Sequence, residues 1–161
     1  MNGNNPFLRT GSSVFWWQSP DIKADYPPFQ TKCAARVDFE NFVDDHGVGA
    51  SGLRHVNPRR GSQARLYVRL RSRQGSVPKN QIVRLYYTAA SLGFPDLPEG
   101  FWADFERDAP TPAASPWRVV VPEQEPSIKL APDGSAIVSC RWSVPDDAPS
   151  NLCFLAVAAG P

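Results

Sequence analysis

The sequence predicts an all-β protein, an antiparallel β-sandwich that forms one domain, and three observations support this prediction. The chain has 161 residues, which suits one domain with one hydrophobic core. It contains 17 Pro and 11 Gly, and these residues separate short apolar runs. No segment shows a long helical period, which argues against a helical bundle or a coiled coil.

The clearest strand covers residues 65–71, where Leu66, Val68 and Leu70 alternate with polar residues. A turn-rich stretch separates it from a second strand over residues 81–88, and we expect the two strands to pair as antiparallel neighbours. Further short strands are predicted over residues 14–18, 32–37, 117–121, 127–130, 136–143 and 152–158.

Two connections are too long for simple turns. In residues 38–63, Phe39, Phe42 and Val43 have helical spacing and could form one turn. Loops of this length are usually functional or disordered. The aromatic rings need burial, so we expect this connection to be ordered.

The second long connection covers residues 89–116. A short helix is predicted over residues 98–107, with Phe101 and Phe105 on one side. Its aromatic residues argue for order in the same way.

The N-terminus argues against classical secretion. Residues 1–6 lack the positive and apolar regions of a signal peptide, and no apolar run approaches the ~18 residues of a membrane span. Residues 1–13 are predicted as a polar arm and residues 14–161 as the domain. We expect cytoplasmic synthesis without a signal peptide, and incorporation into a virion or an extracellular particle stays open.

Charge is balanced overall but divided into blocks. The net charge is +1, the sum of −2 over residues 1–45, +9 over residues 46–95 and −6 over residues 96–147. The total excludes a uniformly basic binder of nucleic acid or anionic membrane. The blocks predict a polar molecule whose opposite ends attract, either within one domain or between subunits arranged head to tail.

The basic block is predicted to form an outward stripe. Alternation places Arg65, Arg69 and Arg71 on one face, with Arg84 on the neighbouring strand. The stripe could pair with the acidic block in the same molecule, bind a polyanion, or contact another protein subunit. The residues predicted to contact a partner are Arg65, Tyr67, Arg69, Arg71, Arg84, Tyr86, Trp16, Phe101 and Trp102.

The sequence contains two aromatic doublets, Trp16–Trp17 and Tyr86–Tyr87, and each must leave one ring outside the core. Neighbours on a strand point to opposite faces, so one ring of each doublet lies outside the sandwich core. We expect that ring to be covered by a long loop or by a partner. A platform for carbohydrate or bases is a further alternative.

No motif predicts catalysis. His46 follows Asp44 and Asp45 and could join a metal site only with distant ligands, so a solvated acidic turn is the preferred interpretation, and His55 is less suggestive still. The chain has no nucleophile elbow, phosphate loop or zinc spacing. We therefore expect no enzyme activity, no cofactor and no metal.

Three cysteines fit no dense disulfide framework. Cys140 and Cys153 fall on consecutive predicted strands, which we expect to form a hairpin, in phase with core positions. A cross-strand disulfide is possible, but two buried thiols are the preferred interpretation.

Several segments resemble a known family. They are YVRLRSRQG (67–75), VRLYY (83–87), VSCRWSVP (138–145), NLCFLAV (151–157) and WQSPDI (17–22). Together they resemble the bacterial CARDB-like group of immunoglobulin-like domains, which typically read V-x-V-x-V-x-N-x-G and then V-x-V-x-L-Y. The turn departs from that pattern, because Ser72 or Arg73 stands where the family has Asn.

The resemblance implies an immunoglobulin-like fold and a role in adhesion, spacing or assembly, with no catalytic residues to transfer. We expect a sandwich of about 7–8 strands with two long loops that carry short helical turns. The predicted function is a non-enzymatic subunit or adaptor of a larger assembly, such as a phage-like or contractile particle, that docks through an edge strand, long loops and an Arg/aromatic face. The alternative is an accessory domain that binds carbohydrate or a cell surface.

Overall fold

The computed structural model describes residues 21–29, 55–71, 79–90, 95–106, 115–123, 127–130 and 134–159. These residues confirm the all-β prediction, because they form antiparallel strands and one short helix. The elements in chain order are β1 (Ile22–Asp25), β2 (Gln63–Arg71), β3 (Lys79–Ala89), α1 (Phe101–Glu106), β4 (Arg118–Val119), β5 (Ser127–Leu130), β6 (Ser135–Ser143) and β7 (Leu152–Ala159).

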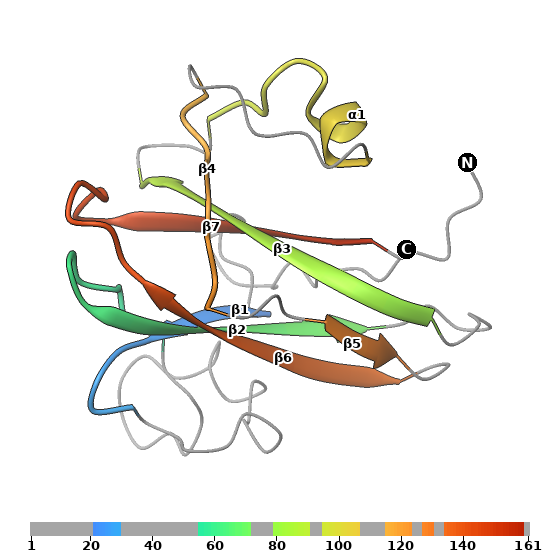
Figure 1. The fold of residues 1–161 in the computed structure, drawn as a ribbon, viewed down its shortest axis with the longest axis horizontal. Coiled ribbons are helices and arrows are strands. Elements are labelled where there is room, and N and C mark those ends of the chain that lie inside the picture. The colour runs from blue at the N-terminus through green and yellow to red at the C-terminus, as the bar shows by residue number, and fades with distance from the viewer. Residues whose placement is uncertain are drawn as a thin grey trace, which may run out of the picture.

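The strands make two sheets. In the first sheet β2 lies between β1 and β6, and it pairs with β6 over its whole length. In the second sheet β3 pairs with β7, and also with β5 near its start and β4 near its end. Figure 1 shows the sheets as two layers, with α1 on the side of the second sheet that faces away from the first.

One hydrophobic core lies between the two sheets. Alternate residues of β2 and β6 point into it, among them Leu66, Val68 and Trp142. The second sheet contributes Leu85 and Tyr87 of β3, and the rings of Tyr87 and Trp142 lie 5.0 Å apart between centroids. The period-two pattern of the sequence therefore identified the buried faces of β2 and β6. It was wrong for β7, where Phe154, Ala156 and Ala158 pack on this core, whereas Leu155 and Val157, the positions in phase with Cys153, lie in a separate cluster with Tyr86.

The predicted pairing of residues 65–71 with residues 81–88 is wrong. β2 and β3 belong to different sheets and face each other across the core. The predicted hairpin of Cys140 and Cys153 is wrong for the same reason, because β6 pairs with β2 while β7 pairs with β3. Alternation shows which face of a strand is buried, but it does not show which sheet the strand joins.

Several predicted elements are confirmed, namely the strands over residues 127–130, 136–143 and 152–158 and the helix within residues 98–107. Of the strand predicted over 117–121, residues 118–119 form β4. No strand was predicted at β1, which has four residues and two charged side chains. The arm 1–13, the strands over 14–18 and 32–37, and the turn at Phe39 lie outside the described residues.

α1, the helix among the described residues, has six residues, and no described helix is long and apolar enough to cross a membrane.

Candidate functional site

The face of β2 that points away from the core carries the predicted basic stripe, but this face is largely buried. Tyr67 is 0% exposed and Arg69 is 7% exposed. Arg65 and Arg71 are half-buried. The stripe is therefore on the predicted face of β2, but the predicted exposed guanidinium patch is wrong at Arg69, which is buried, and is only partly exposed at Arg65 and Arg71.

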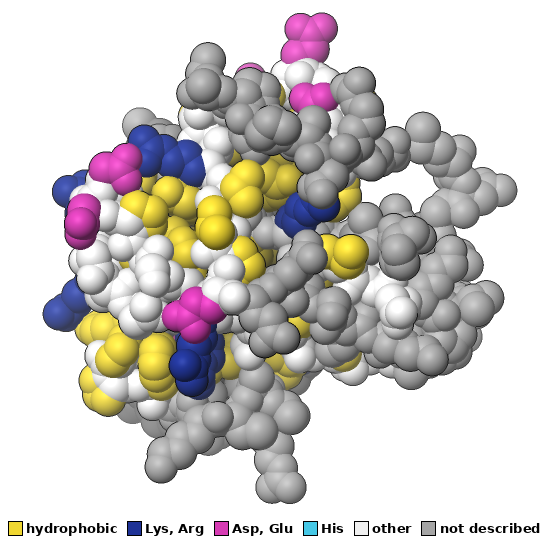
Figure 2. Space-filling view, viewed as in Figure 1, with side chains coloured by type: hydrophobic (Ala, Val, Ile, Leu, Met, Phe, Trp, Pro, Cys, Tyr) yellow, Lys and Arg dark blue, Asp and Glu magenta, His cyan; other side chains and the backbone are white. Residues whose placement is uncertain are grey.

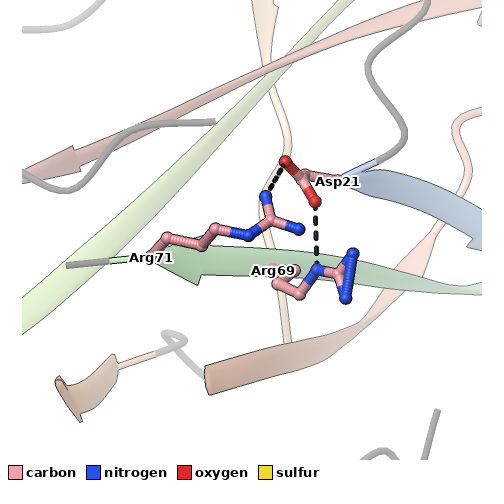
Figure 3. Close-up of polar contacts among 3 residues, drawn as sticks. All are labelled: Asp21, Arg69 and Arg71. Carbon is pink, nitrogen blue, oxygen red and sulfur yellow. Dashed lines mark hydrogen bonds and ion pairs between the residues drawn. The ribbon is translucent and has the colours of Figure 1, made fainter. Parts of the chain in front are cut away.

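Asp21, immediately before β1, neutralises two of these arginines. Nε of Arg69 donates to Oδ1 of Asp21 at 3.0 Å, and Nη1 of Arg71 donates to Oδ2 at 2.5 Å (Figure 3). Arg69 and Arg71 are two residues apart on β2, so alternation places both side chains on the same face. The backbone N–H of Arg69 also donates to the carbonyl oxygen of Asp21 at 2.8 Å.

The same face of β1 continues this charged layer. Lys23 lies opposite Tyr67 in the register and Asp25 lies opposite Arg65, and both charged side chains of β1 are buried. The guanidinium of Arg65 lies 4.4 Å from the ring centroid of Phe29. We call Asp21, Lys23, Asp25, Arg69 and Arg71 the charged layer. Burying charges is costly unless they are paired, and Asp21 pairs with both Arg69 and Arg71.

Among the described residues, the acid that pairs with Arg69 and Arg71 is Asp21, which belongs to residues 1–45, whereas the prediction took the partner from block 96–147. Among the described residues, an acidic residue of that block pairs with Arg118, where Nη1 lies 2.7 Å from Oδ2 of Asp147 at the surface. The hydrogen bond and charge of Arg118 lower the pKa of Asp147, and the reverse effect raises the pKa of Arg118.

Arg84 and Tyr86 lie in the other sheet, on its outer face beneath α1. Nη1 of Arg84 donates to the carbonyl oxygen of Phe105 at 3.1 Å, and its guanidinium lies 5.0 Å from the Phe105 ring centroid. Tyr86 packs against Phe101, with 5.2 Å between ring centroids. Arg84 therefore does not extend the stripe of β2.

The Tyr86–Tyr87 doublet behaves as predicted. Tyr87 joins the core between the sheets, whereas Tyr86 lies in a second cluster with Phe101, Trp117 and Val157. The ring outside the main core is thus covered by the connection that carries α1. Trp16, of the other doublet, lies outside the described residues, as does His46.

Three large hydrophobic side chains are exposed on α1, on β4 and in the segment that follows β4. Trp102 is 58% exposed, Val119 is 40% exposed and Val121 is 75% exposed. Val119 lies opposite Tyr86 in the register, so it shares the face that α1 covers. We call Trp102, Val119 and Val121 the α1–β4 surface. Figure 2 shows hydrophobic side chains gathered over β3, β4 and β7, below α1.

Phe101 and Trp102 have opposite roles although they are neighbours. Phe101 is 6% exposed and anchors α1, and Trp102 meets its ring edge to face at 5.1 Å. Of the nine residues predicted to contact a partner, Trp102 is the most exposed among those described.

Within the described ranges, no three His, Cys, Asp or Glu residues are grouped as a metal site would require. Cys140 and Cys153 are both free thiols. Burial raises the pKa of Cys140 to about 11 and also raises the pKa of Cys153.

Comparison with known proteins found no matching family model, no matching curated protein and no matching solved structure.

Proposed function

We propose that this chain is an immunoglobulin-like β-sandwich module that works without catalysis, as a subunit or adaptor of a larger protein assembly such as a phage-like or contractile particle. The arrangement of two facing antiparallel layers supports the sandwich assignment. So does the segment after β4, which leaves β3 and reaches the other sheet, where Pro122 bridges to Trp142. Segments that change sheets in this way are common at the corners of sandwiches.

The α1–β4 surface carries the functional part of the proposal. Trp102 and Val119 are exposed on the side of the second sheet that carries α1, Val121 is exposed two residues further along the chain, and exposed large apolar side chains of this kind support an interaction site. Trp102 is held at its base by Phe101, so little side-chain freedom is lost when a partner covers it. Trp is also enriched among the residues that dominate binding energy.

The Arg118–Asp147 ion pair is exposed on both partners, but Arg118 precedes Val119 in β4 and so points to the opposite face of that strand. The partner is another protein subunit, and a second copy of this chain in a head-to-tail arrangement is one form of it.

A carbohydrate-binding accessory domain is the second candidate, because an exposed indole such as Trp102 can also stack on a sugar ring. Size-exclusion chromatography with light scattering, over a range of protein concentrations, and a glycan array separate the two candidates. An oligomer that Trp102→Ala dissociates supports assembly. A monomer that binds glycan through Trp102 overturns it.

A matched control variant is Ser135→Ala, at an exposed position where β6 begins in the other sheet. This variant is expected to behave like the wild type in both measurements. Loss of the oligomer in both variants would show that the effect does not depend on the α1–β4 surface.

A further inference from the structure

Residues 55–57 lie along the outer edge of β1. The backbone N–H of Val56 donates to the carbonyl oxygen of Ala24 at 2.9 Å, and the N–H of Ala24 donates to Nδ1 of His55 at 3.1 Å. A side chain therefore accepts a hydrogen bond that a neighbouring strand would otherwise accept. We call residues 55–57 the edge clasp.

The edge clasp also contacts β7, in the other sheet. Oδ1 of Asn57 accepts a hydrogen bond from the backbone N–H of Leu152 at 3.3 Å, and Nδ2 donates to the carbonyl oxygen of Ser150 at 3.2 Å and to Oδ1 of Asn151 at 3.1 Å. The ring of His55 meets that of Phe154 edge to face at 6.5 Å.

The N–H of Leu152 points away from β3. Leu152 lies opposite Ala89, and the ladder bond next to this pair runs from the N–H of Ala90 to the carbonyl oxygen of Asn151. In an antiparallel ladder this pattern directs the N–H of Leu152 outward. The edge clasp therefore joins the outer edge of β1 to the outer edge of β7, and so joins the two sheets.

We propose that the edge clasp is a pH-sensitive latch, in which protonation of His55 at Nδ1 breaks its hydrogen bond with Ala24 and releases the edges of β1 and β7. Nδ1 can accept from the Ala24 N–H only through its lone pair, which requires the neutral imidazole with its hydrogen on Nε2. When Nδ1 takes a proton from solvent, the lone pair is no longer available. The Nδ1–H of His55 and the backbone N–H of Ala24 are then both donors and repel each other.

The groups around His55 favour the neutral ring. On β1, the charge of Lys23 acts on the His55 ring. Asp25 lies on the same strand, next to Ala24, and its Oδ1 accepts a hydrogen bond from the backbone N–H of Tyr26. From β7 the packed side chain is the uncharged Phe154, next to Cys153. His55 is exposed to solvent as a residue, yet desolvation of its ring, followed by the charge of Lys23, lowers its pKa below the usual 6.5.

The direction of the pH effect on stability follows from the difference in proton binding between the folded and the unfolded protein. A histidine whose pKa is lower in the folded protein binds fewer protons there than in the unfolded chain. Its contribution to stability is complete above pH ~6.5 and is lost as the pH falls through the lowered pKa. The latch is therefore closed at neutral pH and opens in mild acid.

Opening would expose a strand edge suited to pairing. Charged residues and proline normally protect an edge strand from pairing with other strands. The sequence of β7, LCFLAVAA, contains neither. This inference does not depend on the α1–β4 surface, which lies on the side of the second sheet that carries α1.

The test is amide hydrogen exchange at Ala24 and Leu152 between pH 7.5 and pH 4.5, corrected for intrinsic exchange, with the amide of Val68 as a core control. We expect protection at Ala24 to fall about tenfold per pH unit below the pKa of His55, because the ratio of protonated to neutral ring changes by that factor. Protection at Leu152 should fall with it, and protection at Val68 should not change.

His55→Asn is the matched variant, because its Oδ1 can accept from Ala24 near the position of Nδ1 but does not titrate. Protection at Ala24 in this variant should not depend on pH. The same pH profile in wild type and variant overturns the proposal.

The ¹⁵N chemical shift of Nδ1 in the wild type gives a second test that requires no variant. It should change from unprotonated to protonated over the same pH range in which Ala24 loses protection. Protonation of His55 without any loss of protection at Ala24 also overturns the proposal.

Discussion

Arg69 donates through Nε to Oδ1 of Asp21 at 3.0 Å, although the two residues are 48 positions apart and both side chains lie inside the protein. The bond connects the residue before β1 to the middle of β2. A buried ion pair adds little net stability over an apolar pair of the same shape, but the loss of one partner leaves an uncompensated buried charge. The same carboxylate also accepts from Arg71, so its removal affects two cations.

Asp21→Ala should therefore destabilise the protein severely. We expect a loss of about 3–5 kcal/mol in the free energy of unfolding, because Arg69 stays buried without its carboxylate. Urea unfolding followed by tryptophan fluorescence measures the loss. Asp147→Ala, which removes an ion pair that is exposed on both sides, should leave the unfolding midpoint nearly unchanged. Equal midpoints for the two variants would contradict the structural role of the charged layer.

Gly61 and Gly100 should both resist substitution because of their backbone conformation. Their φ angles are +63° and +77°, in the region where a Cβ is disfavoured. Replacement of either by Ala should cost about 1–2 kcal/mol in thermal or urea unfolding. A Cβ at Gly61 would also lie 2.5 Å from Oδ1 of Asp146, but that side chain is exposed and can rotate away.

A double variant separates strain from crowding at this turn. Asp146→Ala should not restore the stability lost in Gly61→Ala, since the backbone angle is unaffected. Full recovery in the double variant would show that crowding by Asp146, and not the positive φ, is the cause.

The buried faces of β2 and β6 were predictable from the sequence, whereas the face of β7 that enters the core and the pairing of the strands were not. Leu66, Val68 and Leu70 point into the core as their alternation indicates, because burial of one face imposes a period of two. Whether β2 pairs with β3 or faces it depends on interactions between distant segments, and no local pattern encodes these.

The charged layer shows the same limit. Arg69 and Tyr67 occupy positions that look exposed in an amphipathic strand, yet they are buried. The carboxylate of Asp21 belongs to a four-residue strand region that a propensity argument misses, and it cancels part of the +9 block. It was predictable that one ring of the Tyr86–Tyr87 doublet lies outside the core, because adjacent aromatic residues on a strand cannot both enter one core, but not that α1 rather than a partner covers it.

Phe101 and Trp102 provide a test that separates stability from assembly. Phe101→Ala removes a buried ring that holds α1 on Tyr86 and should cost about 3–5 kcal/mol of unfolding free energy. Trp102→Ala should change stability little, because more than half of its surface is exposed, but it should weaken self-association in light scattering. A Trp102→Ala protein that is as destabilised as Phe101→Ala would show that the indole is structural.

Cys140 and Cys153 should react with thiol reagents at different rates in the folded protein. The thiolate is the reactive form, and burial raises the pKa of Cys140 to about 11, so this residue is almost entirely protonated at pH 8. Cys140 is also 6% exposed, whereas Cys153 is half-buried, so a maleimide should label Cys153 first.

Mass spectrometry of peptides from a Cys33→Ser background gives the two rates directly. Labelling of Cys153 should become faster as the pH rises from 7 to 9, because the thiolate fraction grows about tenfold per unit below the pKa. In urea the two rates should become similar, since both environments are lost. Rapid labelling of Cys140 in the native state would contradict its position in the core beside Leu66.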